Sequence, residues 1–79
     1  MTNLEKYNKA FCDSFEIDTD KLQDLKYQGI DMWDSVGHMT LIANIEDAFD
    51  IMMDTDDIID FSSYVKGLDI LASKYDVQF

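Results

Sequence analysis

Ser35, in the segment Asp34-Ser35-Val36, is the residue whose type and position best suit covalent chemistry. The segment stands where a long irregular stretch gives way to the strongest helical pattern of the chain. A serine in the first turn of a helix is exposed. A phosphate esterified to its hydroxyl would lie against free backbone N–H groups and the positive end of the helix dipole. The position of Ser35 is therefore suited to phosphorylation-like chemistry.

Helix capping is the simpler interpretation of the Asp34–Ser35 pair. Asp and Ser are both favoured at the N-cap, but only one residue can occupy that position. The reciprocal partner of a capping box is missing, since neither Gly37 nor His38 carries the carboxyl or amide group that would reach back. Capping therefore accounts for one residue of the pair and leaves the other unexplained.

His38 follows Ser35 by three positions, which places both on one helical face and raises a hydrolase alternative with histidine as the base. No residue nearby is suited to orient the imidazole, and no glycine-rich elbow presents the serine. A small helical protein also has little room for a substrate cavity. We therefore expect no catalytic residue, and a surface histidine beside Ser35.

Two acidic stretches, residues 18–20 and 54–56, begin like calcium-binding loops. The first lacks the glycine expected at loop position six and the glutamate expected at position twelve. The second has Ile58, Ile59 and Val65 where ligands or the turn glycine should stand. We expect no metal site.

Helices must position these residues, and the spacing of apolar residues predicts four of them. We expect an all-α fold, a small four-helix bundle in a single domain over residues 1–79, with one short helix and a long loop between the first and second helices. The sequence has no proline, no internal repeat and no alternation long enough for a sheet, which agrees with a helical bundle. The predicted helices are residues 4–15, residues 35–49, a short one after the acidic residues 54–57 that runs through Phe61, and one from a cap at Ser62 or Ser63 to near Tyr75.

The connection over residues 16–33 is long for so small a domain, so we expect it to be ordered by its own side chains, with one short turn. Cys12, the single cysteine, cannot form an internal disulfide and is expected to be a half-buried packing residue. The residues expected to pin the loop are Ile17, Leu22, Leu25, Tyr27, Ile30 and Trp33.

Charge limits the partners of the chain. Six Lys plus Arg against seventeen Asp plus Glu give a net charge of −11, which disfavours binding to nucleic acid and to anionic membranes. The same charge steers the chain towards proteins with basic surface patches. The sequence has no signal-peptide pattern and no membrane-length apolar run, so a cytoplasmic monomer is expected.

The segment Asp34-Ser35-Val36, followed by an amphipathic helix that ends in IEDAFDI at residues 45–51, resembles the phosphopantetheine attachment region of acyl carrier proteins. Downstream, the acidic turn, Ile58, Phe61, the Ser-Ser pair and the helix to Leu71 are similar to the third and fourth helices of that family. The resemblance covers the C-terminal half in close register. The N-terminal half fits only in outline, as one helix and a long loop.

The resemblance implies a non-catalytic carrier. Ser35 would receive a 4'-phosphopantetheine arm from a phosphopantetheinyl transferase that uses coenzyme A and magnesium, and the thiol of the arm would hold an acyl group as a thioester. Asp34 and Val36 match family positions that meet the transferase. Glu46 and Asp47 match acidic helix positions that contact acyl-transferring, ligase or synthase enzymes.

The resemblance also implies an interior that shelters the acyl chain between the second and third helices, although core packing alone would account for the same apolar residues. The candidates are Met39, Ile42, Ile45, Phe49, Met53, Ile58 and Phe61, with Met32 and Met52 as further methionines near them.

Gly37 and Thr40 depart from the family pattern, because their positions are frequently acidic there. Glycine inside a helix costs on the order of 1 kcal/mol relative to alanine, so Gly37 indicates a loose helix start or a partner close to its backbone. Both departures favour a dedicated lipid, polysaccharide or secondary-metabolite pathway, and fatty-acid synthesis stays open. An unmodified acidic adaptor and a peptidyl carrier stay open as alternatives.

Overall fold

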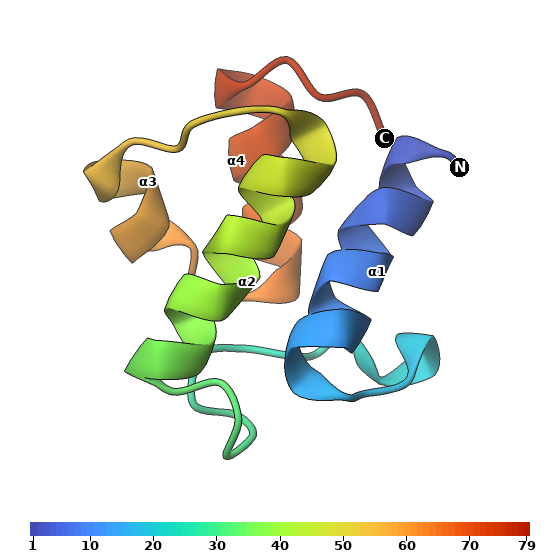
Figure 1. Cartoon of the computed structure of the whole chain (residues 1–79), viewed down its shortest axis with the longest axis vertical. Helices are drawn as coiled ribbons and strands as arrows, with labels where there is room; N and C mark the ends of the chain where they lie inside the picture. The colour runs from blue at the N-terminus through green and yellow to red at the C-terminus, as the bar shows by residue number, and fades with distance from the viewer.

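The computed structural model describes residues 1–79 and contains four α-helices, one 3₁₀ turn and no strand. α2 crosses the front of the molecule with α1 on one side and α3 on the other, and α4 lies behind α2 (Figure 1). The all-α class is confirmed, as are the expected helices to within a few residues. The elements are α1 (Asn3–Phe15), the 3₁₀ turn (Thr19–Lys21), α2 (Ser35–Phe49), α3 (Thr55–Asp60) and α4 (Tyr64–Lys74).

Local side chains define where α1 and α4 begin. Thr2 and Glu5 form a capping box, in which the Glu5 N–H donates to Thr2 Oγ1 at 3.1 Å and the Thr2 N–H donates to Glu5 Oε1 at 2.9 Å. The backbone bond from Thr2 lowers the pKa of Glu5. At α4 the cap is Ser63 rather than Ser62, since the Lys66 N–H donates to Ser63 Oγ at 3.0 Å.

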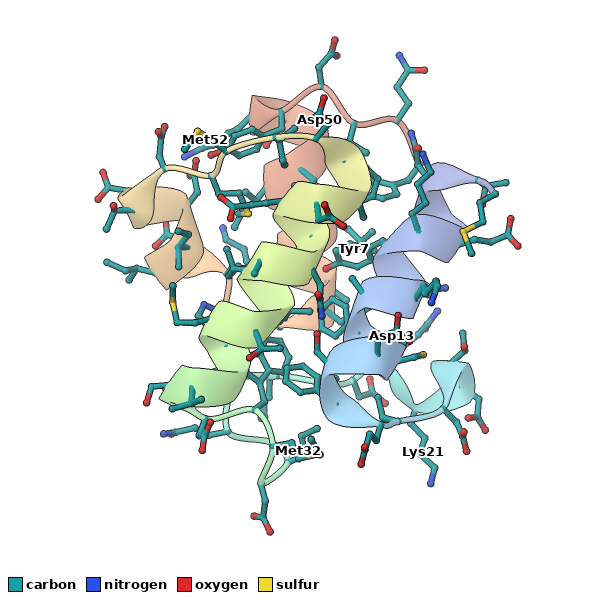
Figure 2. All side chains as sticks on the ribbon, viewed as in Figure 1. Tyr7, Asp13, Lys21, Met32, Asp50 and Met52 are labelled. Carbon is teal, nitrogen blue, oxygen red and sulfur yellow. The ribbon has the colours of Figure 1, made fainter.

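Aromatic residues dominate the core. Phe11 packs edge-on against the Trp33 ring, with ring centroids 5.5 Å apart. Phe15 stacks on the Trp33 ring, with ring centroids 5.2 Å apart. Figure 2 shows the Tyr7 side chain between α1 and α2. Burial of large apolar side chains is the main force that holds a domain of this size together. The side chains with essentially no exposed surface are Tyr7, Phe11, Leu22, Trp33, Leu41, Ile42, Ile45, Phe61 and Leu71.

The loop over residues 16–33 is ordered as expected, with Leu22, Leu25 and Trp33 buried. The middle of the loop is also tied to the start of α4: the Tyr27 N–H donates to the Ser62 carbonyl at 2.8 Å, and the Tyr64 N–H donates to the Leu25 carbonyl at 2.9 Å. These two bonds place the loop beside the α3–α4 junction. Tyr27 is only partly covered, with 36% of its surface exposed.

Gly67 faces the aromatic core from α4. A Cβ at this position would lie 2.2 Å from Phe61 Cζ and 2.3 Å from the Tyr7 hydroxyl oxygen. The Tyr7 hydroxyl donates to the Tyr64 carbonyl at 2.6 Å, and burial raises the pKa of Tyr7. Only glycine leaves room for both rings, so α4 packs on α1 because residue 67 has no side chain.

Asp57 anchors the short helix α3 to the end of α4. Its side chain is buried and accepts from Lys74 Nζ at 2.7 Å and from the Tyr75 hydroxyl at 2.6 Å. The Tyr75 hydroxyl also accepts the Asp54 N–H at 2.8 Å. A six-residue helix has little stability of its own, so these contacts hold α3 in place. The hydrogen bonds from Lys74 and from Tyr75 lower the pKa of Asp57 below its ordinary value of 3.8, although burial opposes them.

We predict that Asp57→Asn lowers the thermal midpoint at neutral pH and that its deficit relative to wild type shrinks in acid. A carboxylate with a lowered pKa stabilises the fold above its unfolded-state pKa of about 3.9, and the contribution is lost as the pH falls through the lower folded-state pKa. Thermal melts of both proteins from pH 7 to pH 3 measure the difference. Protonation of the other acids affects both proteins equally and cancels.

Asp56→Asn is the matched control, because Asp56 is the exposed neighbour in the same helical turn. Its midpoint should follow that of wild type at every pH. A deficit of Asp57→Asn that stays constant down to pH 3 would show that the contacts of Asp57 do not depend on its charge.

Candidate functional site

Asp34 and Ser35 take different positions at the start of α2. Asp34 is the N-cap: its carboxylate accepts the Gly37 N–H at 2.8 Å, and its carbonyl accepts the His38 N–H at 2.8 Å. Ser35 is the first residue of the helix and is exposed, and no group of the protein forms a hydrogen bond with its hydroxyl. No backbone carbonyl accepts the N–H of Ser35 or of Val36. Capping is thus the role of Asp34, and the Ser35 hydroxyl is free.

Ser35 also lies on the wall of a largely apolar cavity of about 400 Å³ between α2, α3 and the loop. This volume lies within the usual range for small-molecule pockets, roughly 300 to 1,000 Å³. A group attached to the Ser35 oxygen can therefore reach apolar surface. The cavity is lined by Tyr27, Ser35, His38, Met39, Ile58, Ile59, Phe61 and Ser62.

The cavity contains only part of the predicted apolar set. Met39, Ile58 and Phe61 line it, and Met39 is 56% exposed rather than buried. Ile42, Ile45 and Met53 are buried in the core and do not line it, and the half-buried Phe49 packs edge-on against Phe79 at 6.1 Å. Met32 and Met52 lie on the outside, on the loop and on the α2–α3 connection (Figure 2).

Tyr27, Ile59 and Ser62 line the cavity although nothing in the sequence indicated that they would. The Tyr27–Ser62 backbone bond brings two segments together that are far apart in the chain. Helical periodicity describes residues within one element, so it carries no information about such a pairing.

His38 is not the surface residue that we expected. Its ring is half-buried, its Nδ1 accepts the Trp33 indole N–H at 2.9 Å, and its Nε2 lies 2.7 Å from the Ile58 carbonyl oxygen. Both ring nitrogens are therefore engaged in holding Trp33 and α3 against α2. Neither nitrogen faces the Ser35 hydroxyl, so the geometry offers no serine–histidine pair.

Packing within the protein explains why residue 37 is glycine. A Cβ on Gly37 would lie 1.8 Å from the Met32 carbonyl oxygen and 3.3 Å from the Phe15 ring. The loop passes directly against the backbone of α2 here. The glycine therefore serves internal packing, which accounts for it without a loose helix start or an external partner.

The predicted recognition residues differ in how free they are. Val36 is 75% exposed, and Asp34 and Asp47 are exposed as well. Glu46 is half-buried and accepts the Met53 N–H at 2.9 Å, so one of its oxygens holds the α2–α3 connection. Val36 and Asp47 are available to a partner, whereas Asp34 and Glu46 are available only in part, because one carboxylate oxygen of each accepts a backbone N–H.

Few of the acidic residues are neutralised. The protein has two salt bridges, Lys9 to Asp13 and Lys74 to Asp57, both at 2.7 Å, against a net charge of −11. No group of three or more His, Cys, Asp or Glu side chains is arranged to hold a metal ion. The surface therefore presents a strong negative field, which favours association with basic surfaces.

The fold and the site define a small, acidic, all-α protein with one free serine hydroxyl at a helix start beside an apolar cavity. None of its helices has the length and apolar character needed to cross a membrane. Comparison of the chain with family models, with curated proteins and with solved structures finds no match.

Proposed function

We propose that this chain is an acyl carrier protein with the four-helix architecture of that family. Ser35 carries 4'-phosphopantetheine, whose terminal thiol holds an acyl group as a thioester. The chain performs no catalysis and is itself the substrate of a phosphopantetheinyl transferase. It acts as a cytoplasmic monomer that presents its cargo to acyl-transferring, ligase or synthase enzymes.

The observation that carries this proposal is the free Ser35 hydroxyl at the first position of α2, on the wall of an apolar cavity. A phosphodiester on this oxygen fits the site, because the adjacent N–H groups of Ser35 and Val36 have no backbone partner and the helix dipole favours negative charge there. The cavity offers apolar surface within reach of the attached group. Asp34 caps the helix at the adjacent position.

The surroundings of Ser35 support recognition by other proteins. Val36 projects beside it with 75% of its surface exposed, which suits contact with a transferase. Asp47 and the free part of Glu46 place acidic groups near the end of α2. A net charge of −11 accelerates association with basic partners without requiring tight binding.

Incubation with coenzyme A, magnesium and a broad-specificity phosphopantetheinyl transferase tests the proposal. We expect intact-protein mass spectrometry to show complete conversion of wild type to a species one phosphopantetheine heavier, and no conversion of Ser35→Ala. Ser62→Ala is the matched control, because Ser62 is an exposed serine on the wall of the same cavity, and it should be modified like wild type.

An unmodified wild type would overturn the carrier proposal and leave the acidic adaptor as the alternative. Modification of the Ser35→Ala variant would show that the arm is attached to another residue. The group bound to the thiol of the arm distinguishes the two classes of carrier. A fatty or other acyl group supports an acyl carrier, and an amino acid supports a peptidyl carrier.

A further inference from the structure

We propose that His38 limits how far an apolar group attached at position 35 enters between α2 and α3, so that the cavity accepts short acyl groups and excludes long chains. The inference rests on the proposed function only in naming the attached group as acyl. The limit on chain length is a property of the cavity.

The hydrogen bonds of His38 define one tautomer. An indole N–H only donates, so Nδ1 of His38 must be the acceptor of the 2.9 Å bond from Trp33. The proton is then on Nε2, which donates to the Ile58 carbonyl at 2.7 Å. In this neutral form the ring bridges the loop and α3, and each end of the bridge is on a different element.

Ring packing holds the imidazole in the same position. It stacks on Trp33 with centroids 6.1 Å apart and planes 15° from parallel, and it meets Tyr27 and Phe61 edge-on at 5.5 Å and 6.2 Å. His38 lines the cavity, while Trp33 has no exposed surface and does not line it. The imidazole therefore separates the cavity from the indole.

Displacing this wall is costly. Moving the ring breaks both hydrogen bonds and leaves the indole N–H of a fully buried tryptophan without an acceptor. Behind it, the Trp33 ring packs on Phe11 and Phe15 at 5.5 Å and 5.2 Å, so no space is waiting to be filled. A short chain fits in front of the imidazole, and a long chain must stay in solvent.

Chains tethered at position 35 test the inference without any transferase. In a Cys12→Ser background that removes the native thiol, Ser35→Cys is labelled with methyl, butyl or decyl methanethiosulfonate, and thermal midpoints are compared. With His38 present, we expect butyl to raise the midpoint above methyl by about 4 °C or more and decyl to add nothing further. In His38→Ala, decyl should exceed butyl by a similar amount.

His38→Gln is the rescue variant, since its amide both accepts and donates a hydrogen bond. This variant should restore the result seen with His38, in which the decyl label raises the thermal midpoint no further than the butyl label. Each comparison is made between chain lengths on one variant, so loss of stability on replacing His38 cancels.

A decyl midpoint well above the butyl midpoint on the protein with His38 would overturn the inference, and this reading needs no histidine variant to fold. Identical profiles for His38 and His38→Ala would also overturn it. The carrier proposal fails on a different result, the missing phosphopantetheine adduct on wild type, so the two failures are distinguishable.

Discussion

Gly67→Ala lowers the free energy of unfolding by about 3 kcal/mol, the upper part of the usual range for overpacking a core. The new Cβ would stand 2.2 Å from Phe61 Cζ and 2.3 Å from the Tyr7 hydroxyl oxygen. Neither ring has exposed surface to retreat into. Displacing Tyr7 also strains its hydrogen bond to the Tyr64 carbonyl.

Intrinsic helix propensity favours the opposite outcome, because alanine is better than glycine inside a helix by about 1 kcal/mol. The steric cost exceeds the gain in helix propensity, so the substitution destabilises the protein. In thermal melts the midpoint should fall by at least about 10 °C for a domain of this size. Lys66→Ala, at the exposed neighbouring position of α4, should change the midpoint little. A Gly67→Ala protein as stable as wild type would mean that α4 is free to shift away from α1.

Gly37→Ala lowers the free energy of unfolding by about 2 kcal/mol. Its Cβ would lie 1.8 Å from the Met32 carbonyl oxygen, and a backbone atom cannot rotate away as a side chain can. Either the loop or the first turn of α2 must move, and both movements disturb Trp33 beneath them. Urea unfolding measures the loss.

The control for Gly37 is Ala43→Gly, at an exposed position of the same helix. It isolates the propensity term and should cost about 1 kcal/mol. If Gly37 were kept only for an external partner, Gly37→Ala would stabilise the isolated protein by a similar amount. A gain in stability would therefore reinstate the partner explanation.

Local patterns were sufficient for the helices. Apolar residues at three- and four-residue spacing and polar residues at the caps act within one segment, so the limits of α2 at Ser35 and Phe49 follow directly from the sequence. The order of the long loop was also predictable, because apolar residues such as Leu22 and Leu25 must be buried somewhere.

The role of individual residues was harder to predict where their partners lie in other elements. Gly37 was read as a helix weakness, because the Met32 carbonyl that excludes a side chain is brought there by the turn of the loop. His38 was read as a surface group, because its acceptor at Ile58 belongs to α3. Ile42 and Ile45 were candidates for a cavity because of the family resemblance, with core packing as the alternative, and the structure places both in the core. Apolar periodicity does not distinguish a packed core from a hollow one.

The sequence by itself determined the all-α class, the helix limits and the position of Ser35 at a helix start, since these depend on interactions within a few residues. The tertiary structure decided that the free Ser35 hydroxyl borders an apolar cavity and that His38 forms part of its wall. Those features depend on the loop, α2 and α3 meeting at one place. Contacts between distant segments form only when the whole chain packs to bury its apolar surface, so no local pattern encodes them.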